Sequence, residues 1–166
     1  MVTWLRTNTI AAGILAVLRI WLGYNWFTHG IDKLQHGFDA SGYLKFAISA
    51  PVKGPDGNIL YGWYVSFLEN FALPNAKLFN FVIPWAETLI GLGLILGCLT
   101  TAAAFFALVM NFSFFFAGTV SSNPPTMLAA FILLFAGYNA GKFGLDRWVV
   151  PAMRKFFPWH KKESKV

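Results

Sequence analysis

The chain has 166 residues, of which 57% are hydrophobic and only 12% are charged, and its formal net charge is +6. Soluble domains carry about twice that share of charged residues, so the composition excludes an ordinary water-soluble domain and indicates an integral membrane protein. The length suits a single domain, 1–166. The one cysteine, Cys98, excludes an intrachain disulfide and a redox pair within the chain.

The first predicted element is a transmembrane helix over residues 8–28, in which Arg19 is the only charged residue. A signal peptide would also combine a basic residue, Arg6, with an apolar run at 10–22. However, Arg19 interrupts that run, and no small-residue cleavage site follows it. Large aromatic residues, among them Trp26, follow instead, so the pattern favours a retained helix.

The connection 29–77 carries four acidic and four basic residues and is predicted to face outward. It contains a predicted short helix at 38–49, begun by Asp39 or Ser41. A second amphipathic helix is predicted at 64–79, broken at Pro74, after which Asn75 can cap the helix that enters the membrane. Both short helices are expected to lie at the membrane interface and to cover the outer end of the bundle.

The stretch 78–141 contains a single charged residue, Glu87. It is too long for one span and too short for four, because a span needs about 20 residues. The uncharged turn GCLTT at 97–101 and the polar turn SSNPPT at 121–126 divide it. The resulting predicted spans are 78–98, 101–119 and 126–143.

Lysine and arginine gather after the last predicted span, where the segment from Lys142 onward holds seven basic and two acidic residues. By the positive-inside rule, the basic tail 144–166 faces the cytoplasm, and four spans place the N-terminus on the same side. The predicted fold is therefore an all-α, polytopic membrane four-helix bundle with interfacial helices in a long outer connection. Because its position beside a span already explains the basic tail, no nucleic-acid partner is predicted.

Arg19 and Glu87 are each predicted to lie about 16 Å along their helices, near the membrane midplane. An unpaired charge there costs about 2.5–3.5 kcal/mol, so we predict an Arg19–Glu87 ion pair inside the bundle. Asn111 of the third span lies at a similar predicted depth. One interpretation is that the buried pair has a purely structural role and fixes the helix register. Intramembrane ionisable residues nevertheless indicate a functional site by default.

A second group of polar residues is predicted at the outer end of the first span. His29 and Asp32 share a helix face there, next to Lys33. An imidazole at a membrane boundary can pass protons, so His29 is a candidate proton or ligand site. His36 would add a second imidazole, but without a third strong ligand no metal site is predicted.

Three segments resemble the DoxX/DoxD family of small four-helix membrane proteins: LRIWLGYNWFTHGIDKL at 18–34, PWAETLIGLGLILGCLTTAAAF at 84–105 and AGYNAGKFGLDRW at 136–148. The resemblance implies a membrane oxidoreductase component, similar to a subunit of thiosulfate:quinone oxidoreductase. It also implies bacterial relatives tied to thiol, sulfur or quinone stress. Because the sequence contains no haem, flavin or iron–sulfur signature, electron transfer would need a bound quinone or a partner redox subunit.

The leading hypothesis is a quinone-linked oxidoreductase subunit of the plasma membrane. A channel or transporter for a small solute or proton is one alternative, and a non-catalytic scaffold for a soluble enzyme is the other. The expected partners are the lipid bilayer, the quinone or another small substrate, a partner redox subunit and further copies of the chain. The predicted catalytic residues are Arg19, Glu87, His29 and Asp32, and the predicted quinone contacts are Arg19, Glu87, Asn111, Trp26 and Lys33.

Overall fold

The computed structural model describes residues 2–119 and 123–156, in which nearly every regular element is a helix. The exception within these two ranges is an isolated antiparallel bridge at Lys53. The prediction of an all-α fold is therefore confirmed. The end of the predicted basic tail, 157–166, lies outside the described residues, as do the first positions of the predicted turn at 121–126.

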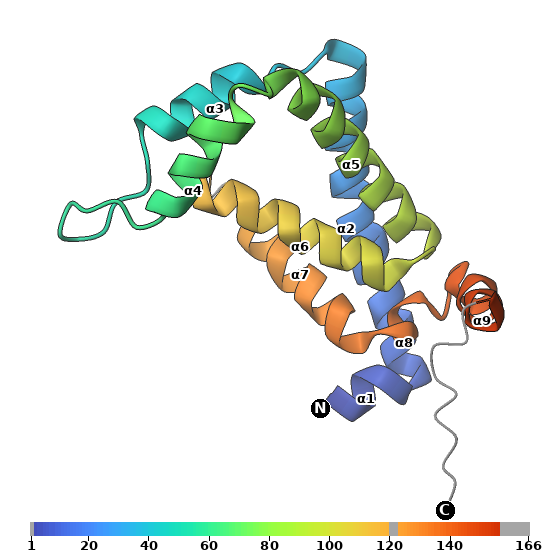
Figure 1. Ribbon diagram of the computed structural model, residues 1–166. Coiled ribbons are helices and arrows are strands. Elements are labelled where there is room, and N and C mark those ends of the chain that lie inside the picture. Colours follow the sequence, from blue (N-terminus) through green and yellow to red (C-terminus); the bar gives the residue numbers. More distant parts are fainter. Residues whose placement is uncertain (1, 120–122, 157–166) are drawn as a thin grey trace, which may run out of the picture.

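Among the described residues, two helices are long and apolar enough to cross a membrane, α2 (Thr9–His36) and α5 (Ala76–Leu96), and they run side by side (Figure 1). The side chain of Asn8 begins α2 by accepting hydrogen bonds from two backbone N–H groups of the first turn. The helix continues past the predicted end of the span 8–28 and stops only at Gly37. The φ of 82° at Gly37 is one that glycine adopts readily.

The two other apolar helices, α6 (Thr100–Phe116) and α7 (Asn123–Ala136), are shorter than the predicted spans 101–119 and 126–143. At 1.5 Å per residue, they measure about 25 Å and about 21 Å. A glycine with a φ of 58° ends α7, and the short helix α8 (Tyr138–Gly141) follows. The prediction of four membrane crossings therefore stays a prediction.

The predicted outer connection contains α3 (Ala40–Ser49), α4 (Gly62–Phe67) and a π-helix, η1 (Leu68–Ala72). The predicted first short helix is confirmed as α3. Its cap is the side chain of Asp39, which accepts a 3.0 Å hydrogen bond from the backbone N–H of Ser41. The predicted second helix is divided between α4, the π-helix and the start of α5.

The first and last described helices, α1 (Val2–Thr7) and α9 (Asp146–Phe156), lie at the end of the molecule opposite to α3 and α4 (Figure 1). The amide of Asn139 donates hydrogen bonds to the carbonyl oxygens of Leu5, at 2.7 Å, and Asn8, at 2.9 Å. These bonds attach the start of the chain to α8.

Glycines allow α2 and α5 to pack backbone against backbone. A Cβ at Gly30 would lie 2.5 Å from the backbone nitrogen of Thr88, and a Cβ at Gly91 would overlap the backbone of Phe27. A Cβ at Gly23 would collide with the last turn of α5. These contacts fix an antiparallel register in which the second half of α2 faces α5.

Two clusters of buried apolar residues hold the helices together. The larger cluster is rich in alanine and joins α2, α5, α6, α7 and α8. The smaller one joins α3, α4 and the π-helix to Ala117, just after α6. Small residues at these contacts permit the close helix approach that is common in membrane proteins.

Candidate functional site

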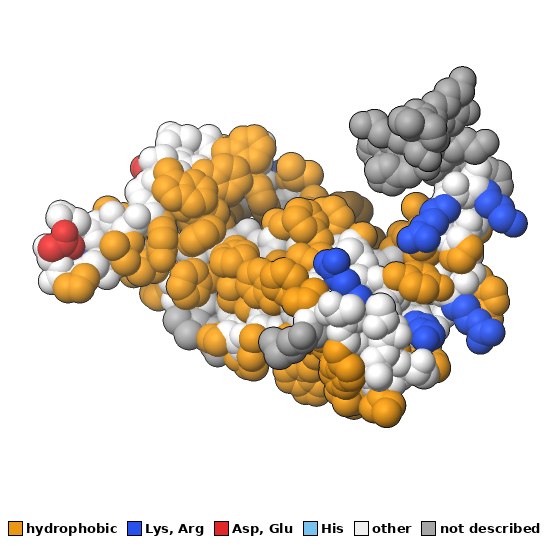
Figure 2. All heavy atoms as spheres, turned by 90° about the horizontal axis from the view of Figure 1, so that it is seen from below, with side chains coloured by type: hydrophobic (Ala, Val, Ile, Leu, Met, Phe, Trp, Pro, Cys, Tyr) orange, Lys and Arg blue, Asp and Glu red, His pale blue; other side chains and the backbone are white. Residues whose placement is uncertain are grey.

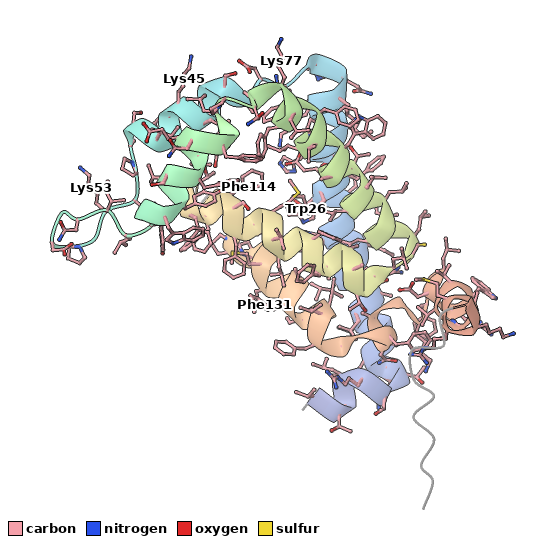
Figure 3. The ribbon with its side chains drawn as sticks, in the orientation of Figure 1. Trp26, Lys45, Lys53, Lys77, Phe114 and Phe131 are labelled. Carbon is pink, nitrogen blue, oxygen red and sulfur yellow. The ribbon has the colours of Figure 1, made fainter. Side chains whose placement is uncertain are left out.

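A cavity of about 290 Å³ lies where α2, α3, α5, α6 and α7 meet. Figure 3 shows two of its aromatic side chains, Trp26 on α2 and Phe114 on α6, near the centre of the molecule. Because its walls come from segments far apart in the sequence, only the tertiary fold creates it. The lining residues are Asn25, Trp26, His29, Lys33, Phe38, Tyr43, Glu87, Asn111, Phe114, Thr119, Asn123 and Thr126.

Glu87 is paired inside this cavity with Lys33. The Nζ of Lys33 donates to the Oε1 of Glu87 at 2.5 Å, and the two side chains are 24% and 3% exposed. The ammonium also lies 5.1 Å from the ring centroid of Phe38 and 5.8 Å from that of Phe114. Cation–π attraction and the ion pair together offset the cost of removing these charges from water.

The predicted ion pair between Arg19 and Glu87 is therefore wrong. The prediction aligned the first two spans end to end and placed both charges at one depth. In the structure, α2 continues beyond the predicted span, and its contact between Gly30 and Thr88 brings Glu87 opposite the later turns of α2. Arg19 lies instead beside Gly97, at the far end of α5.

Arg19 is buried, with 2% of its surface exposed, against the turn that joins α5 to α6. Its Nη2 donates a long hydrogen bond of 3.5 Å to the carbonyl oxygen of Phe143. A Cβ at Gly97 or Gly144 would collide with the guanidinium, so both glycines make room for it. The carboxylate of Asp146 attracts the guanidinium electrostatically. We call these four residues, Arg19, Gly97, Gly144 and Asp146, the clasp.

Asp146 has a structural role that the sequence pattern does not predict. Its Oδ1 accepts a 2.6 Å hydrogen bond from the N–H of Leu99, and its Oδ2 accepts a 2.9 Å bond from the N–H of Thr100. Its own N–H donates to the carbonyl oxygen of Gly97 at 2.7 Å. Asp146 thus caps the start of α6 from a distant part of the chain. A lone acidic residue in the basic segment KFGLDRW was the available signal.

Three buried polar atoms on the cavity residues have no hydrogen-bond partner within residues 2–119 and 123–156: Trp26 Nε1, Asn111 Nδ2 and Glu87 Oε2. The hydroxyl of Thr126 lies 3.0 Å from Asn111 Oδ1 and 2.9 Å from the carbonyl oxygen of Asn123 and can donate to one of them at a time, whereas the Nδ2 of Asn111 has no partner within these residues. Most buried polar groups in proteins are paired. Two donors and one acceptor on a single cavity therefore favour a ligand that both accepts and donates hydrogen bonds.

His29 connects the cavity to the exterior, because it lines the cavity and its side chain is exposed. Its Nδ1 lies 2.6 Å from the carbonyl oxygen of Asn25 and must carry a proton to donate to it. Nε2 is then the ring nitrogen that can accept a proton. Asp32 does not line the cavity; its carboxylate lies 3.0 Å from Nδ1 of His36, with both side chains 73% exposed.

Tyr43 of α3 closes one side of the cavity. Its hydroxyl lies 3.0 Å from the hydroxyl of Thr119, and its ring meets Phe114 edge-on with 6.2 Å between centroids. Burial raises the pKa of the Tyr43 phenol and so favours its neutral form further. The sequence reading assigned α3 to the membrane interface and did not predict this contact.

The structure brings most of the predicted site residues to one cavity, but not Arg19 or Asp32. The spacing of the α2 residues, i, i+3 and i+7, is a helical face and could have predicted that part of the wall. The aromatic and hydroxyl residues of the opposite wall have no such pattern. The predicted residues that line the cavity are Trp26, His29, Lys33, Glu87 and Asn111.

Within the described residues, the fold is all-helical, two of its helices are of membrane length, and a mainly apolar cavity with a few polar groups lies between the helices; this arrangement fits an integral membrane protein with an internal ligand-sized site. The model of the DoxX family matches residues 14–120, and the chain belongs to this family. The matched segment includes both Lys33 and Glu87, whereas Asp146 lies beyond it. Comparisons with curated proteins and with solved structures gave no significant match.

Proposed function

We propose that the chain is an integral membrane subunit of a quinone-linked oxidoreductase, acting in sulfur, thiol or quinone redox chemistry, and that its cavity binds the quinone ring. The observation that carries the proposal is the set of unpartnered polar atoms on Trp26, Asn111 and Glu87. Quinone carbonyls accept hydrogen bonds, and quinol hydroxyls donate them. The two N–H donors therefore suit the oxidised form, and the free carboxylate oxygen suits the reduced form.

The size and walls of the cavity support the same ligand. Its volume of about 290 Å³ lies just below the range of roughly 300–1,000 Å³ that is usual for ligand sites. A ring system would fill it, and an isoprenoid tail would extend into the bilayer. Trp26, Phe38, Tyr43 and Phe114 offer flat faces and edges against which an aromatic ring can pack.

A bound quinone supplies the transfer of two electrons and two protons, and the chain would position the ring and handle protons. Glu87 would exchange a proton at Oε2, while Oε1 stays bound to Lys33. Cation–π contacts with Phe38 and Phe114 would keep the ammonium of Lys33 in position when the carboxylate of Glu87 changes charge. His29, with an acceptor at Nε2, would relay protons to the exterior. Arg19 keeps its place in the clasp and makes no contact with the ring.

We propose that α2, α5, α6 and α7 cross the cell membrane, with both termini in the cytoplasm. The position of α1 and α9 at one end of the molecule supports an even number of crossings (Figure 1). Lys45, Lys53 and Lys77 point away from the helices at the other end (Figure 3). That connection has no excess of basic residues, whereas the segment from Lys142 onward does, which supports the orientation.

The proposal is tested by titrating the purified chain in nanodiscs with a short-tailed naphthoquinone and measuring the quenching of tryptophan fluorescence. The wild type should bind saturably, and Phe114→Trp should abolish binding by filling the cavity. Phe105→Trp is the matched control, because Phe105 lies on the same helix but is 50% exposed outside the cavity. Non-saturable quenching, or equal loss in both variants, would overturn the proposal.

Proteoliposomes separate this function from the transporter alternative. Flux of protons or of a small solute in the absence of any redox couple would favour a channel or transporter. Loss of a partner enzyme on truncation after Trp148, with quinone binding unchanged, would show that the tail anchors a partner redox subunit.

A further inference from the structure

A second concave feature lies at the end of the molecule that carries α9. It is a groove of about 760 Å³ between the first half of α6 and α9. Phe105, Phe106 and Met153 line it and are 50%, 56% and 45% exposed. None of the residues that line this groove lines the cavity between α2 and α5. The groove is therefore a separate, largely apolar surface.

Positive charge stands beside this apolar surface. Arg154 lines the groove, and Arg147 and Lys155 lie on the same helix. The acidic residue of that helix, Asp146, also lines the groove, but it is buried and its two carboxylate oxygens accept from N–H groups at the start of α6, so the exposed basic side chains of α9 outnumber it. Figure 2, which views the molecule from below, shows basic side chains gathered at one end of a largely hydrophobic face.

The inner part of the groove offers a polar group. Thr100 lines the groove and is fully buried, and its hydroxyl has no hydrogen-bond partner in the part of the chain that the structure describes. A buried hydroxyl beside an apolar wall is complementary to an ester or phosphate oxygen. An apolar wall, an internal hydroxyl and a basic rim together match the parts of a phospholipid.

We propose that this groove binds one anionic phospholipid, with its phosphate at Arg154 and an acyl chain along Phe105, Phe106 and Met153. The occupant is a lipid and not a soluble anion, because most of the wall is apolar. An amphipathic helix such as α9, with basic and apolar residues, is also the element that proteins place at an anionic membrane surface. The proposal rests on the membrane location of the chain and is independent of quinone binding.

A bound lipid would stabilise the clasp. Thr100 and Asp146 belong both to the groove and to the contact that fastens α9 to the turn after α5. A ligand that binds only the folded chain stabilises it by mass action. Anionic lipid should therefore raise the melting temperature of the chain, and the effect should depend on the residues of the groove.

The test is native mass spectrometry of the full chain released from nanodiscs of phosphatidylcholine that contain a minor fraction of phosphatidylglycerol. One phosphatidylglycerol should stay bound to each wild-type chain. Arg154→Gln should weaken its retention about tenfold or more, the loss expected for one hydrogen bond to a charged group. Lys155→Gln is the matched control, because it removes the same charge from the same helix outside the groove lining. It should retain the lipid.

Met153→Trp provides a variant that leaves the charge unchanged. Met153 is 45% exposed, so the larger ring can be accommodated without disturbing the core, and it should displace the acyl chain.

Equal losses in Arg154→Gln and Lys155→Gln would show a general surface attraction and overturn the proposal. Equal retention of phosphatidylcholine, or displacement by glycerol phosphate alone, would overturn it as well. Quinone titration of the same variants should match the wild type, which separates this test from that of the proposed function.

Discussion

The ammonium of Lys33 and the carboxylate of Glu87 meet at 2.5 Å across the interface between α2 and α5. The sequence places Lys33 beside Asp32, at the end of the first predicted span, and Glu87 alone in the middle of the second. The register of the two helices brings Lys33 and Glu87 together in one site. The cavity consequently has a buried carboxylate that is paired through one oxygen and free at the other.

Replacing Glu87 by Gln should destabilise the chain, because Lys33 then keeps its charge in a partly buried site without a counter-ion. Breaking a fully buried ion pair costs about 3–5 kcal/mol, and the partial exposure of Lys33 reduces this figure. The free energy of unfolding, measured by SDS titration, should fall by about 1–3 kcal/mol. The double variant Lys33→Met/Glu87→Leu should recover most of the loss, since it removes both charges. A double variant no more stable than Glu87→Gln would contradict the pairing.

Trp26→Phe should weaken quinone binding without weakening the fold. The substitution removes an N–H that has no partner among the described residues and keeps most of the ring. One lost hydrogen bond to the ligand corresponds to about 1 kcal/mol, or roughly a fivefold increase in Kd. Trp21→Phe is the matched control, because Trp21 lies on the same helix but is 43% exposed outside the cavity. A loss of stability in Trp26→Phe, with unchanged Kd, would assign this indole to packing alone.

The sequence was sufficient to predict the helical class, the family and five of the cavity residues. Composition excludes a soluble domain, and the order of short motifs around Arg19 and Glu87 indicates the family. His29, Lys33 and Glu87 can be identified because charged and imidazole groups are conspicuous in an apolar helix. That signal depends on residue type and needs no knowledge of the tertiary fold.

The partners of the charges could not be predicted, because they depend on where two helices cross. A hydropathy pattern gives the length of a helix only approximately, and an error of a few residues changes which side chains face each other. Here α2 extends to His36, and the glycine contacts place Glu87 opposite Lys33, which becomes its ion-pair partner in place of Arg19. The opposite wall of the cavity depends on Tyr43 and its contact with Thr119, which join segments far apart in the chain.

Gly91→Ala should separate α2 from α5 and destabilise the chain. A Cβ at this position would overlap the backbone of Phe27, which cannot move without shifting the helix. Overpacking of this kind typically costs about 1–3 kcal/mol. Gly13→Ala is the control, because a Cβ there meets nothing within 4 Å, and alanine favours helix by up to about 1 kcal/mol. Melting temperatures should therefore fall for Gly91→Ala and stay equal or rise for Gly13→Ala; equal shifts would contradict the close contact.

Two tyrosines in the connection between α2 and α5 should make the stability fall at alkaline pH. Burial raises the pKa values of Tyr43 and Tyr64 above the ordinary value of about 10. A raised pKa in the folded state means stability that is present below the unfolded pKa and is lost as the pH rises through the folded pKa. The free energy of unfolding should thus decrease above about pH 10. The variant Tyr43→Phe/Tyr64→Phe should decline less steeply, and a decline identical to that of the wild type would contradict the prediction.

The buried arginine should prove to be structural. Asp146→Asn should cost about 1–2 kcal/mol, because a neutral amide caps the start of α6 with one acceptor where the carboxylate has two. Arg19→Met should also lower the melting temperature, since Arg19 fills the space left by Gly97 and Gly144 and attracts Asp146. The loss in the double variant should be smaller than the sum of the two single losses, because the residues interact.

The Kd for the quinone should be the same in all three variants and in the wild type, because neither residue lines the cavity. A large increase of the Kd for the quinone in Arg19→Met, with the fold intact, would contradict this prediction and show that Arg19 belongs to the ligand site.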